Sequence, residues 1–276
     1  MNIKEFITEL IERKMKDERI YPDKLEAAAF IEELFQFLFI PTRQDKHFDG
    51  LLHRLSNIEN RLAYLLAESI NDEALIKKHT SLFFNELPNL YRQLVYDAEA
   101  LLDFDPAARD LSEVKLAYPG FYAAVVYRLS NQLWKQGVKL LPRLFTEYAH
   151  SKTGIDIHPA ASIGSRFAID HGTGVVIGET TIIGNDVRIY QGVTWGALHV
   201  QKMNAPGKRH PTIEDNVVIY SGTTILGGET VIGKGSVVGG NVWLTHSIPP
   251  NSVVYHKSEF KHRGHQPFPV EAHFAN

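Results

Sequence analysis

An aspartate and a histidine stand side by side at Asp170 and His171, in the segment IDHGTGVVIGET. A histidine oriented by a carboxylate can act as a general base, because the ordinary pKa of imidazole, about 6.5, lies close to neutral pH. A further carboxylate, Asp156, comes 15 residues before the histidine. These residue types predict a site at which His171 removes a proton from a substrate.

A second polar cluster, Arg209 and His210, stands in the sequence KRHP. The planar guanidinium of arginine pairs well with a carboxylate, so this cluster could hold an acidic substrate group. Each cluster also has a plainer interpretation. A turn aspartate can satisfy nearby backbone N–H groups, and KRH can be an exposed charged loop. Neither cluster alone establishes a site.

The second half of the chain repeats a large apolar residue every six positions. The repeated positions are Ile157, Ile163, Ile169, Ile177, Ile183, Ile189, Trp195, Ile213, Ile219, Ile225, Ile232, Val238 and Leu244. This period predicts a coil of short parallel strands, in which each six-residue unit forms one side of a triangular prism. Burial of each inward side chain contributes about 1.5–3 kcal/mol, so stacked columns of them would hold the coil together. The period does not set the hand of the coil.

Interruptions of this repeat are more informative than the repeat itself. The step from Ile169 to Ile177 is eight residues, two too many, and it contains the Asp-His pair. Between Trp195 and Ile213 the apolar beat is lost over a full turn. We expect an extruded loop over residues 197–211, and loops on rigid scaffolds often carry functional sites.

The first half of the chain has the 3.6-residue period of amphipathic helices instead. One helix is predicted near the start of the chain, with a buried face formed by Ile3, Phe6, Ile7, Leu10 and Ile11. Two more follow over residues 51–70 and 121–137, and Pro106 indicates a loop between helices. The predicted divisions are a helical oligomerisation domain (1–150), a catalytic solenoid (151–255) and a tail (256–276).

Composition restricts the function further. The 276 residues carry a formal net charge of −3, so a nucleic-acid partner is not expected. There is no cysteine, which excludes disulfides, thiolate catalysis and Cys-ligated zinc. The start of the chain lacks the apolar core of a signal peptide, and no apolar run is long enough to span a bilayer. We therefore expect a cytoplasmic protein without a membrane partner.

Three segments together resemble the serine acetyltransferases of the hexapeptide-repeat acyltransferase superfamily. They are FDPAARD, YPGFYAAVVYRLSNQLWKQG, and the stretch from DIHPAASIG through IDHGTGVVIGET to KRHPTIEDNVVI. The resemblance covers residues 98–252. It implies an α+β protein, with an amino-terminal α-helical domain followed by a left-handed parallel β-helix. The left hand follows from the resemblance alone.

This resemblance implies an activity and assigns residues to it. The enzymes transfer the acetyl group of acetyl-CoA to the hydroxyl of L-serine in a ternary complex, as the first step of cysteine biosynthesis, and need no metal. In this chain His171 would be the general base and Asp156 would orient it. The substrate-binding residues would be Asp105, Asp170, Arg209 and His210. The site would lie between subunits of a homotrimer. In this family the helical domains commonly pair two trimers into a hexamer, so a homotrimer and a dimer of trimers both stay open.

The resemblance also places the acetyl-CoA contacts. Ala197 falls in a loop that replaces a Gly-rich CoA-binding loop, and Ser221 falls near the thioester arm. Lys234 is a candidate for the CoA phosphates, and its alternative interpretation is a solvated surface residue. Relatives that bind cysteine synthase often end in isoleucine, whereas this chain ends in Asn276. We therefore do not expect the cysteine synthase complex in its usual form.

Three alternatives remain at this point. The acyl acceptor could be another amino acid, such as homoserine, or a sugar hydroxyl. Asp105, Arg209 and His210 suit a zwitterion better than a sugar. A zinc carbonic anhydrase on the same solenoid would need three convergent histidines, for which His158, His171 and His210 are candidates. A scaffold without catalytic activity is the third alternative, and the intact set of polar residues argues against it.

Overall fold

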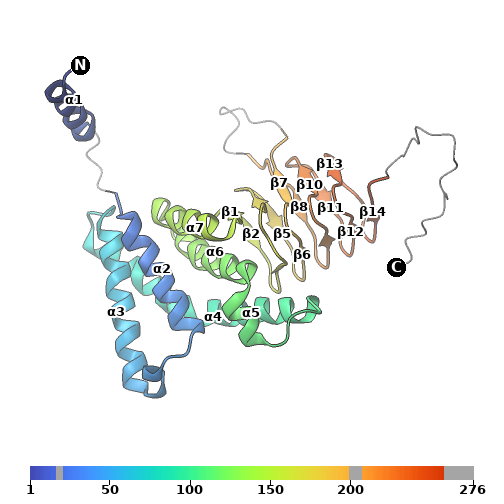
Figure 1. The fold of residues 1–276 in the computed structure, drawn as a ribbon, viewed down its shortest axis with the longest axis horizontal. Helices are drawn as coiled ribbons and strands as arrows, with labels where there is room; N and C mark the ends of the chain where they lie inside the picture. Colours follow the sequence, from blue (N-terminus) through green and yellow to red (C-terminus); the bar gives the residue numbers. More distant parts are fainter. Residues whose placement is uncertain (17–20, 199–206, 258–276) are drawn as a thin grey trace.

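The structure is a computed structural model that describes residues 1–16, 21–198 and 207–257 (Figure 1). Within these residues a group of helices precedes a coil of short strands. The helices are α1 (Ile3–Met15), α2 (Lys24–Phe39), α3 (Phe48–Ala67), α4 (Glu73–Phe104), α5 (Leu111–Ala117), α6 (Pro119–Lys135) and α7 (Leu140–Thr153), with a 3₁₀ turn η1 (Arg43–Lys46). None of the helices in this described part is both long and apolar enough to cross a bilayer.

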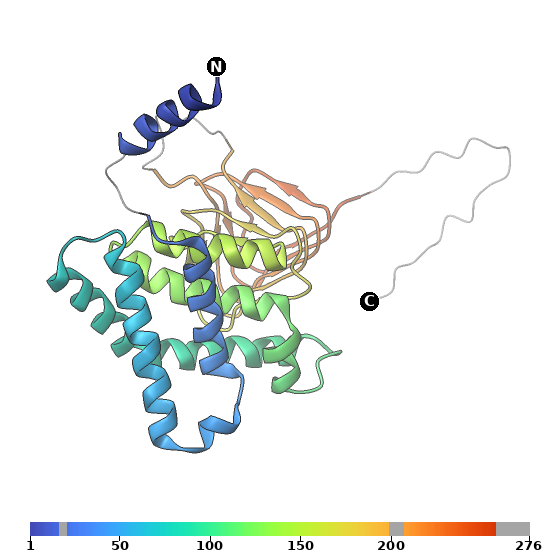
Figure 2. The ribbon, with the colours of Figure 1, turned by 60° about the vertical axis from the view of Figure 1, so that its left-hand side comes forward.

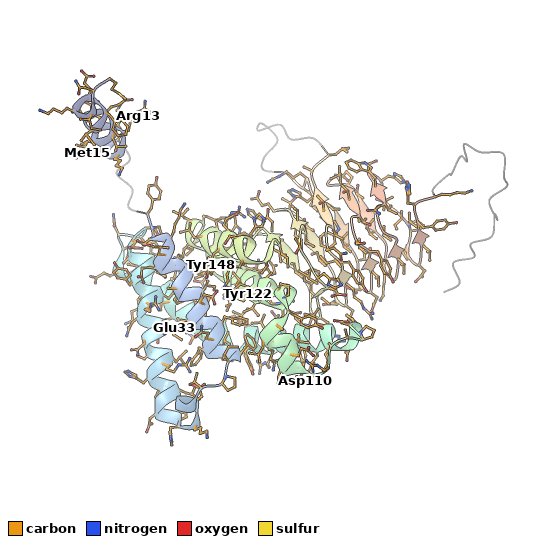
Figure 3. The ribbon with its side chains drawn as sticks, viewed as in Figure 1. Arg13, Met15, Glu33, Asp110, Tyr122 and Tyr148 are labelled. Carbon is orange, nitrogen blue, oxygen red and sulfur yellow. The ribbon has the colours of Figure 1, made fainter. Side chains whose placement is uncertain are left out.

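Helix α1 forms where the sequence predicts a helix, but it buries nothing. A capping box begins it: the Asn2 side chain accepts from the Glu5 N–H at 3.0 Å, and the Glu5 carboxylate accepts from the Asn2 N–H at 2.8 Å. No residue of α1 is buried, and Ile3 and Phe6 are exposed. The predicted burial of its apolar face is therefore wrong, because α1, at whose end Figure 3 labels Met15, does not join the core of the other helices.

The remaining helices share one apolar core. Phe30 of α2, Leu62 of α3, Leu94 of α4 and Phe121 of α6 are fully buried in it. Helices α4, α6 and α7 contact the first strands of the coil, whereas α2 and α3 pack on the side of the helices that faces away from it (Figures 1 and 2). The predicted loop at Pro106 is confirmed, because α4 ends just before it.

A polar contact joins α2 to α6 and α7, two of the three helices that contact the solenoid. Tyr122 of α6 and Tyr148 of α7, labelled in Figure 3, donate their hydroxyls to the Glu32 carboxylate at 2.8 and 3.1 Å. Lys152 pairs with the same carboxylate. These contacts lower the pKa of Glu32 against its desolvation by burial, so it stays ionised.

The strands coil around a triangular prism. They are β1 (Asp156–Ile157), β2 (Ser162–Ile163), β3 (Ala168–Ile169), β4 (Val176–Ile177), β5 (Ile182–Ile183), β6 (Arg188–Ile189), β7 (Thr194–Gly196), β8 (Thr212–Ile213), β9 (Val218–Ile219), β10 (Thr224–Leu226), β11 (Val231–Ile232), β12 (Val237–Val238), β13 (Trp243–Leu244) and β14 (Val253–Val254). They pair in parallel into three sheets, which we call face A (β1-β4-β7-β10-β13), face B (β2-β5-β8-β11) and face C (β3-β6-β9-β12-β14). Each edge of the prism is named by the faces it joins, such as edge C/A.

The six-residue repeat correctly predicts which residues face the interior. Each predicted position is the second residue of a short strand, and Trp195, Ile213 and Ile225 are fully buried. Parallel pairing sets equivalent positions opposite each other, such as Ile177 with Trp195. The columns of apolar side chains make the coil rigid, so residues on its edges have fixed positions.

A buried ion pair fixes the helices to the solenoid. Arg128 of α6 pairs with Asp97 of α4, and its guanidinium also donates to the carbonyls of Ile163 and Gly164 at 3.3 and 2.6 Å. Asp97 accepts from the backbone N–H of Phe167 at 3.0 Å. The end of α4 is therefore held in a defined place against edge B/C, where β2 turns into β3.

Candidate functional site

The two extra residues in the repeat form an enlarged turn at edge C/A, between β3 and β4. In this turn His171 has φ 56°, Gly172 φ 90° and Gly174 φ 83°. Gly174 stacks on Gly192 of the next coil, and Gly192 on Gly222, so Gly174 occupies the ordinary corner position. The additional residues precede it and carry His171 outward, where 72% of its side chain is exposed.

Two carboxylates lie beside this turn in the same chain. The Nε2 atom of His171 is 3.8 Å from Oδ1 of Asp170. Asp170 and Asp105 line one small pocket, together with Arg188 and Tyr190. The structure thus brings together three of the predicted site residues, although they come from the end of α4 and from an edge of the solenoid.

Asp105 is held in place by its neighbours. It caps the end of α4, and its Oδ1 atom accepts from the Ala107 N–H at 2.8 Å. Its Oδ2 atom accepts from the hydroxyl of Tyr118 at 2.5 Å, and this bond to the carboxylate is the largest of the causes that raise the pKa of Tyr118 to about 12. Tyr118 is a site residue that sequence reasoning missed, since only its place before Pro119 in the YPGFYAAVV motif marks it.

Asp156 lies in the coil beside the enlarged turn, because β1 pairs with β4 and the Asp156 N–H donates to the Val175 carbonyl at 2.9 Å. Burial raises the pKa of its carboxyl, while His150 and Arg143 of α7 lower it. In the part of one chain that the structure describes, no hydrogen bond joins Asp156 to His171. Its orienting role stays a prediction.

Arg209 and His210 lie on a different edge, A/B, against the turn between β4 and β5. Their backbone N–H groups donate to the Thr180 hydroxyl at 2.9 and 3.0 Å, and Arg209 pairs with Glu179. The His210 ring packs on Gly178, where a Cβ atom would lie 2.2 Å from it. The sequence therefore needs glycine at this position for the ring to fit.

The protonation of His210 follows from its surroundings. Its Nδ1 atom accepts from the Thr180 N–H at 3.1 Å, which leaves Nε2 to carry the proton of a neutral ring. Burial, followed by the charges of Arg209 and Lys208, lowers the pKa of His210 to about 4. At neutral pH it can therefore donate an uncharged hydrogen bond from Nε2.

The three predicted CoA contacts lie on three different edges. Ala197 follows β7 at edge A/B, and Ser221 lies at edge C/A, two coils along from the enlarged turn. Lys234 is exposed at edge B/C, where its N–H donates to the Glu214 carboxylate at 2.7 Å. Residues 199–206 of the predicted loop and 258–276 of the predicted tail lie outside the described residues.

A metal site was part of one alternative. Among the residues that the structure describes, no three His, Cys, Asp or Glu side chains gather closely enough to hold a metal ion. His158 and His210 are near edge A/B, and burial is the first of the causes that lower the pKa of His158 to about 4. His171, the third candidate histidine, lies on edge C/A.

A three-sided parallel β-helix, with a general-base candidate and carboxylates on one edge, defines the class of the hexapeptide-repeat acyltransferases, whose β-helix is left-handed. No family model matches the chain. Individual relatives, however, agree with this class. A Bacillus subtilis serine acetyltransferase is 46% identical over 164 residues, which cover 59% of this chain and 73% of that protein. A plasmid serine acetyltransferase from Synechococcus elongatus is 49% identical over 190 residues, 66% of this chain and 59% of the relative's length.

A solved structure supports the same assignment. The crystal structure of Entamoeba histolytica serine acetyltransferase 1 in complex with L-cysteine superposes with a TM-score of 0.77 at 36% identity, over 82% of this chain and 86% of that chain. The chain belongs to the serine acetyltransferase family. The predicted fold, a helical domain followed by a left-handed parallel β-helix, and the predicted enzyme class are confirmed.

Proposed function

We propose that the protein transfers the acetyl group of acetyl-CoA to the hydroxyl of L-serine, at a site that two copies of the chain complete. The observation that carries this proposal is the division of the predicted residues between two edges. His171, Asp170 and Asp105 lie at edge C/A, whereas Arg209 and His210 lie at edge A/B. Of the predicted residues, the carboxylates at edge C/A suit an ammonium group, and Arg209 at edge A/B suits a carboxylate, so a zwitterion would use both edges.

A cyclic trimer would bring these halves together. Both edges border face A, so three chains that turn face A toward a common axis place edge C/A of one against edge A/B of the next. On the outer side of face A, Thr194 and Thr224 lie between Val176 and Trp243, and the Trp243 side chain is 67% exposed. Tryptophan is enriched in protein interfaces, so this exposed indole supports the assembly.

The chemistry then follows from the residues in the groove between edge C/A of one chain and edge A/B of the next. Asp105 and Asp170 face the ammonium group of serine, and Arg209 of the neighbouring copy pairs with the carboxylate. His171 takes the hydroxyl proton as the serine oxygen attacks the thioester carbonyl. The carbon–sulfur bond then breaks, and the CoA thiolate accepts from the imidazolium the proton that came from serine. O-acetylserine and CoA leave.

The orientation of His171 is the second part of the proposal. The 3.8 Å separation from Asp170 is too long for a hydrogen bond, so another group must fix the ring. Asp156 is proposed for this role, since its coil adjoins the enlarged turn and it is partly buried. Asp156→Asn should lower turnover and leave the KM for serine nearly unchanged, because Asp156 does not touch the substrate.

Acetyl-CoA would occupy the groove between copies. Ser221 and the neighbour's Ala197 border that groove, because they lie on edges C/A and A/B. Lys234 lies on edge B/C, away from this groove. A contact between Lys234 and the CoA phosphates would require acetyl-CoA to extend across face C. The alternative interpretation of Lys234 as a solvated residue accords with its exposure.

A thiol-release assay tests the proposed function. Purified protein is given acetyl-CoA with L-serine, homoserine or a simple sugar, and free CoA is measured. We expect turnover with L-serine to exceed turnover with the others, and His171→Ala to reduce it by about 100-fold or more. Faster turnover with homoserine or a sugar would overturn the choice of acceptor, and near-normal turnover of His171→Ala would overturn the role of the histidine.

A further inference from the structure

A column of equivalent positions runs along face C at edge C/A, beginning at Asp170. The residue that directly follows each strand of face C points outward, because the last residue of the strand points inward. These residues are Asp170 after β3, Tyr190 after β6, Tyr220 after β9, Gly239 after β12 and Tyr255 after β14. Backbone hydrogen bonds between successive coils, such as Tyr220 N–H to the Val238 carbonyl at 2.8 Å, fix their register.

The column holds stacked aromatic rings with one position left without a side chain. The rings of Tyr190 and Tyr220 lie parallel, with centroids 5.0 Å apart and 4° between their planes. The next position is Gly239, and Tyr255 comes one coil further. The positions of Tyr220 and Tyr255 are therefore two coils apart, about 9.6 Å at the usual strand spacing. A flat ring midway would stand about 4.8 Å from each, within the range of stacked aromatic pairs.

Both tyrosines have ring surface available for such a contact. Tyr220 is 44% exposed although one face of its ring packs on Tyr190, and Tyr255 is 75% exposed. In the described part of the chain no aromatic contact joins Tyr220 to Tyr255. Gly239 adds no side-chain atoms to this space, and a Cβ there would lie 3.2 Å from the Val254 carbonyl oxygen and 3.4 Å from the Cα of Tyr255.

We propose that this tyrosine slot, formed by Tyr220, Gly239 and Tyr255, binds the adenine ring of the acyl donor. The inference rests on the proposed function, because it takes acetyl-CoA as the donor. The slot lies three coils from Asp170, about 14 Å along the prism axis. An extended pantetheine arm can bridge such a distance with its thioester at His171. Ser221, which follows Tyr220, lies between the two ends.

The test compares donors with and without adenosine. Base stacking on an aromatic side chain is lost when that side chain becomes alanine, so Tyr220→Ala should raise the KM for acetyl-CoA about tenfold with kcat unchanged. Acetyl-phosphopantetheine lacks the adenosine 3′,5′-bisphosphate of acetyl-CoA, and the KM of Tyr220→Ala for this donor should equal that of the wild type for the same donor. Tyr220→Phe keeps the ring and should behave as wild type. Tyr64→Ala, an exposed tyrosine on α3, is the matched control.

A second variant and a binding measurement make the result independent of turnover. Gly239→Val fills the slot and should also raise only the KM for acetyl-CoA, while its activity with acetyl-phosphopantetheine shows that it folds. Calorimetry should show that desulfo-CoA binds about tenfold more weakly to Tyr220→Ala than to wild type.

Two results would overturn the slot. One is an equal rise in KM for both donors, and the other is unchanged desulfo-CoA binding in Tyr220→Ala. Failure of the wild type to transfer acetyl groups from either donor would refute the proposed function instead. The calorimetric comparison would still decide whether the slot binds the nucleotide.

Discussion

Mixing two impaired variants tests whether the site is shared between copies. His171→Ala removes the proposed general base at edge C/A, and Arg209→Ala removes the proposed partner of the substrate carboxylate at edge A/B. Loss of a charge-assisted bond to the substrate carboxylate costs about 1.5–3 kcal/mol, so Arg209→Ala alone should lower kcat/KM for serine about 10- to 100-fold. The two variants carry different purification tags, are unfolded together and are reassembled as a mixture.

The magnitude of the recovery follows from the two edges. In a cyclic assembly each interface joins edge C/A of one chain to edge A/B of the next. In an equal mixture the first edge is intact in about half of the chains and the second edge in about half, so about one quarter of the interfaces are complete. The mixture should therefore regain about one quarter of the wild-type kcat/KM per chain, measured as thiol release at low serine.

A matched mixture separates the shared site from a site within one chain. Wild type mixed equally with the double variant His171→Ala/Arg209→Ala should show about one quarter of wild-type activity if the site is shared, and about one half if each chain holds its own site. If the two single variants regain no activity in a mixture whose tags prove that subunits have exchanged, the shared site is refuted.

The solenoid could be predicted in detail because its energetics are local and repetitive. Ile189 and its equivalents in the other coils pack in the same column of side chains, so the six-residue period alone predicts the burial of Ile189. For α1 the prediction of a buried face was wrong, because an apolar stripe on a helix does not identify the surface against which it packs. In this chain the α1 stripe stays exposed.

Two parts of the candidate site could be predicted because their residues are neighbours in sequence, whereas Asp105 and Asp156 were predicted from the family resemblance. Asp170 with His171, and Arg209 with His210, stand out as pairs and at interruptions of the repeat. The Tyr118 bond to Asp105 depends on how α4, α5 and the start of α6 fold back on one another, which no period encodes. The separation of the two pairs on different edges likewise follows from which strands each turn joins.

Three further predictions concern assembly and stability. Trp243→Glu should convert oligomers to single chains in analytical ultracentrifugation and abolish turnover, because a charge replaces the apolar side chain on face A; an active single chain would contradict the shared site. Arg128→Met should lower the free energy of unfolding by about 3–5 kcal/mol in denaturant titrations, since Asp97 would keep a buried charge without its partner. The double variant Asp97→Leu/Arg128→Met should recover only part of the lost free energy of unfolding, because the carbonyls of Ile163 and Gly164 still lack the Arg128 donor. Acidification should destabilise the fold through His210, whose pKa falls from 6.5 to about 4 on burial. Below pH 6.5 the unfolded chain binds a proton that folded His210 does not, so this stability is fully present above pH 6.5 and is lost as pH falls toward 4. His210→Gln should flatten the decline in melting temperature over that interval, and an equally steep decline in the variant would show that His210 does not titrate as its burial requires.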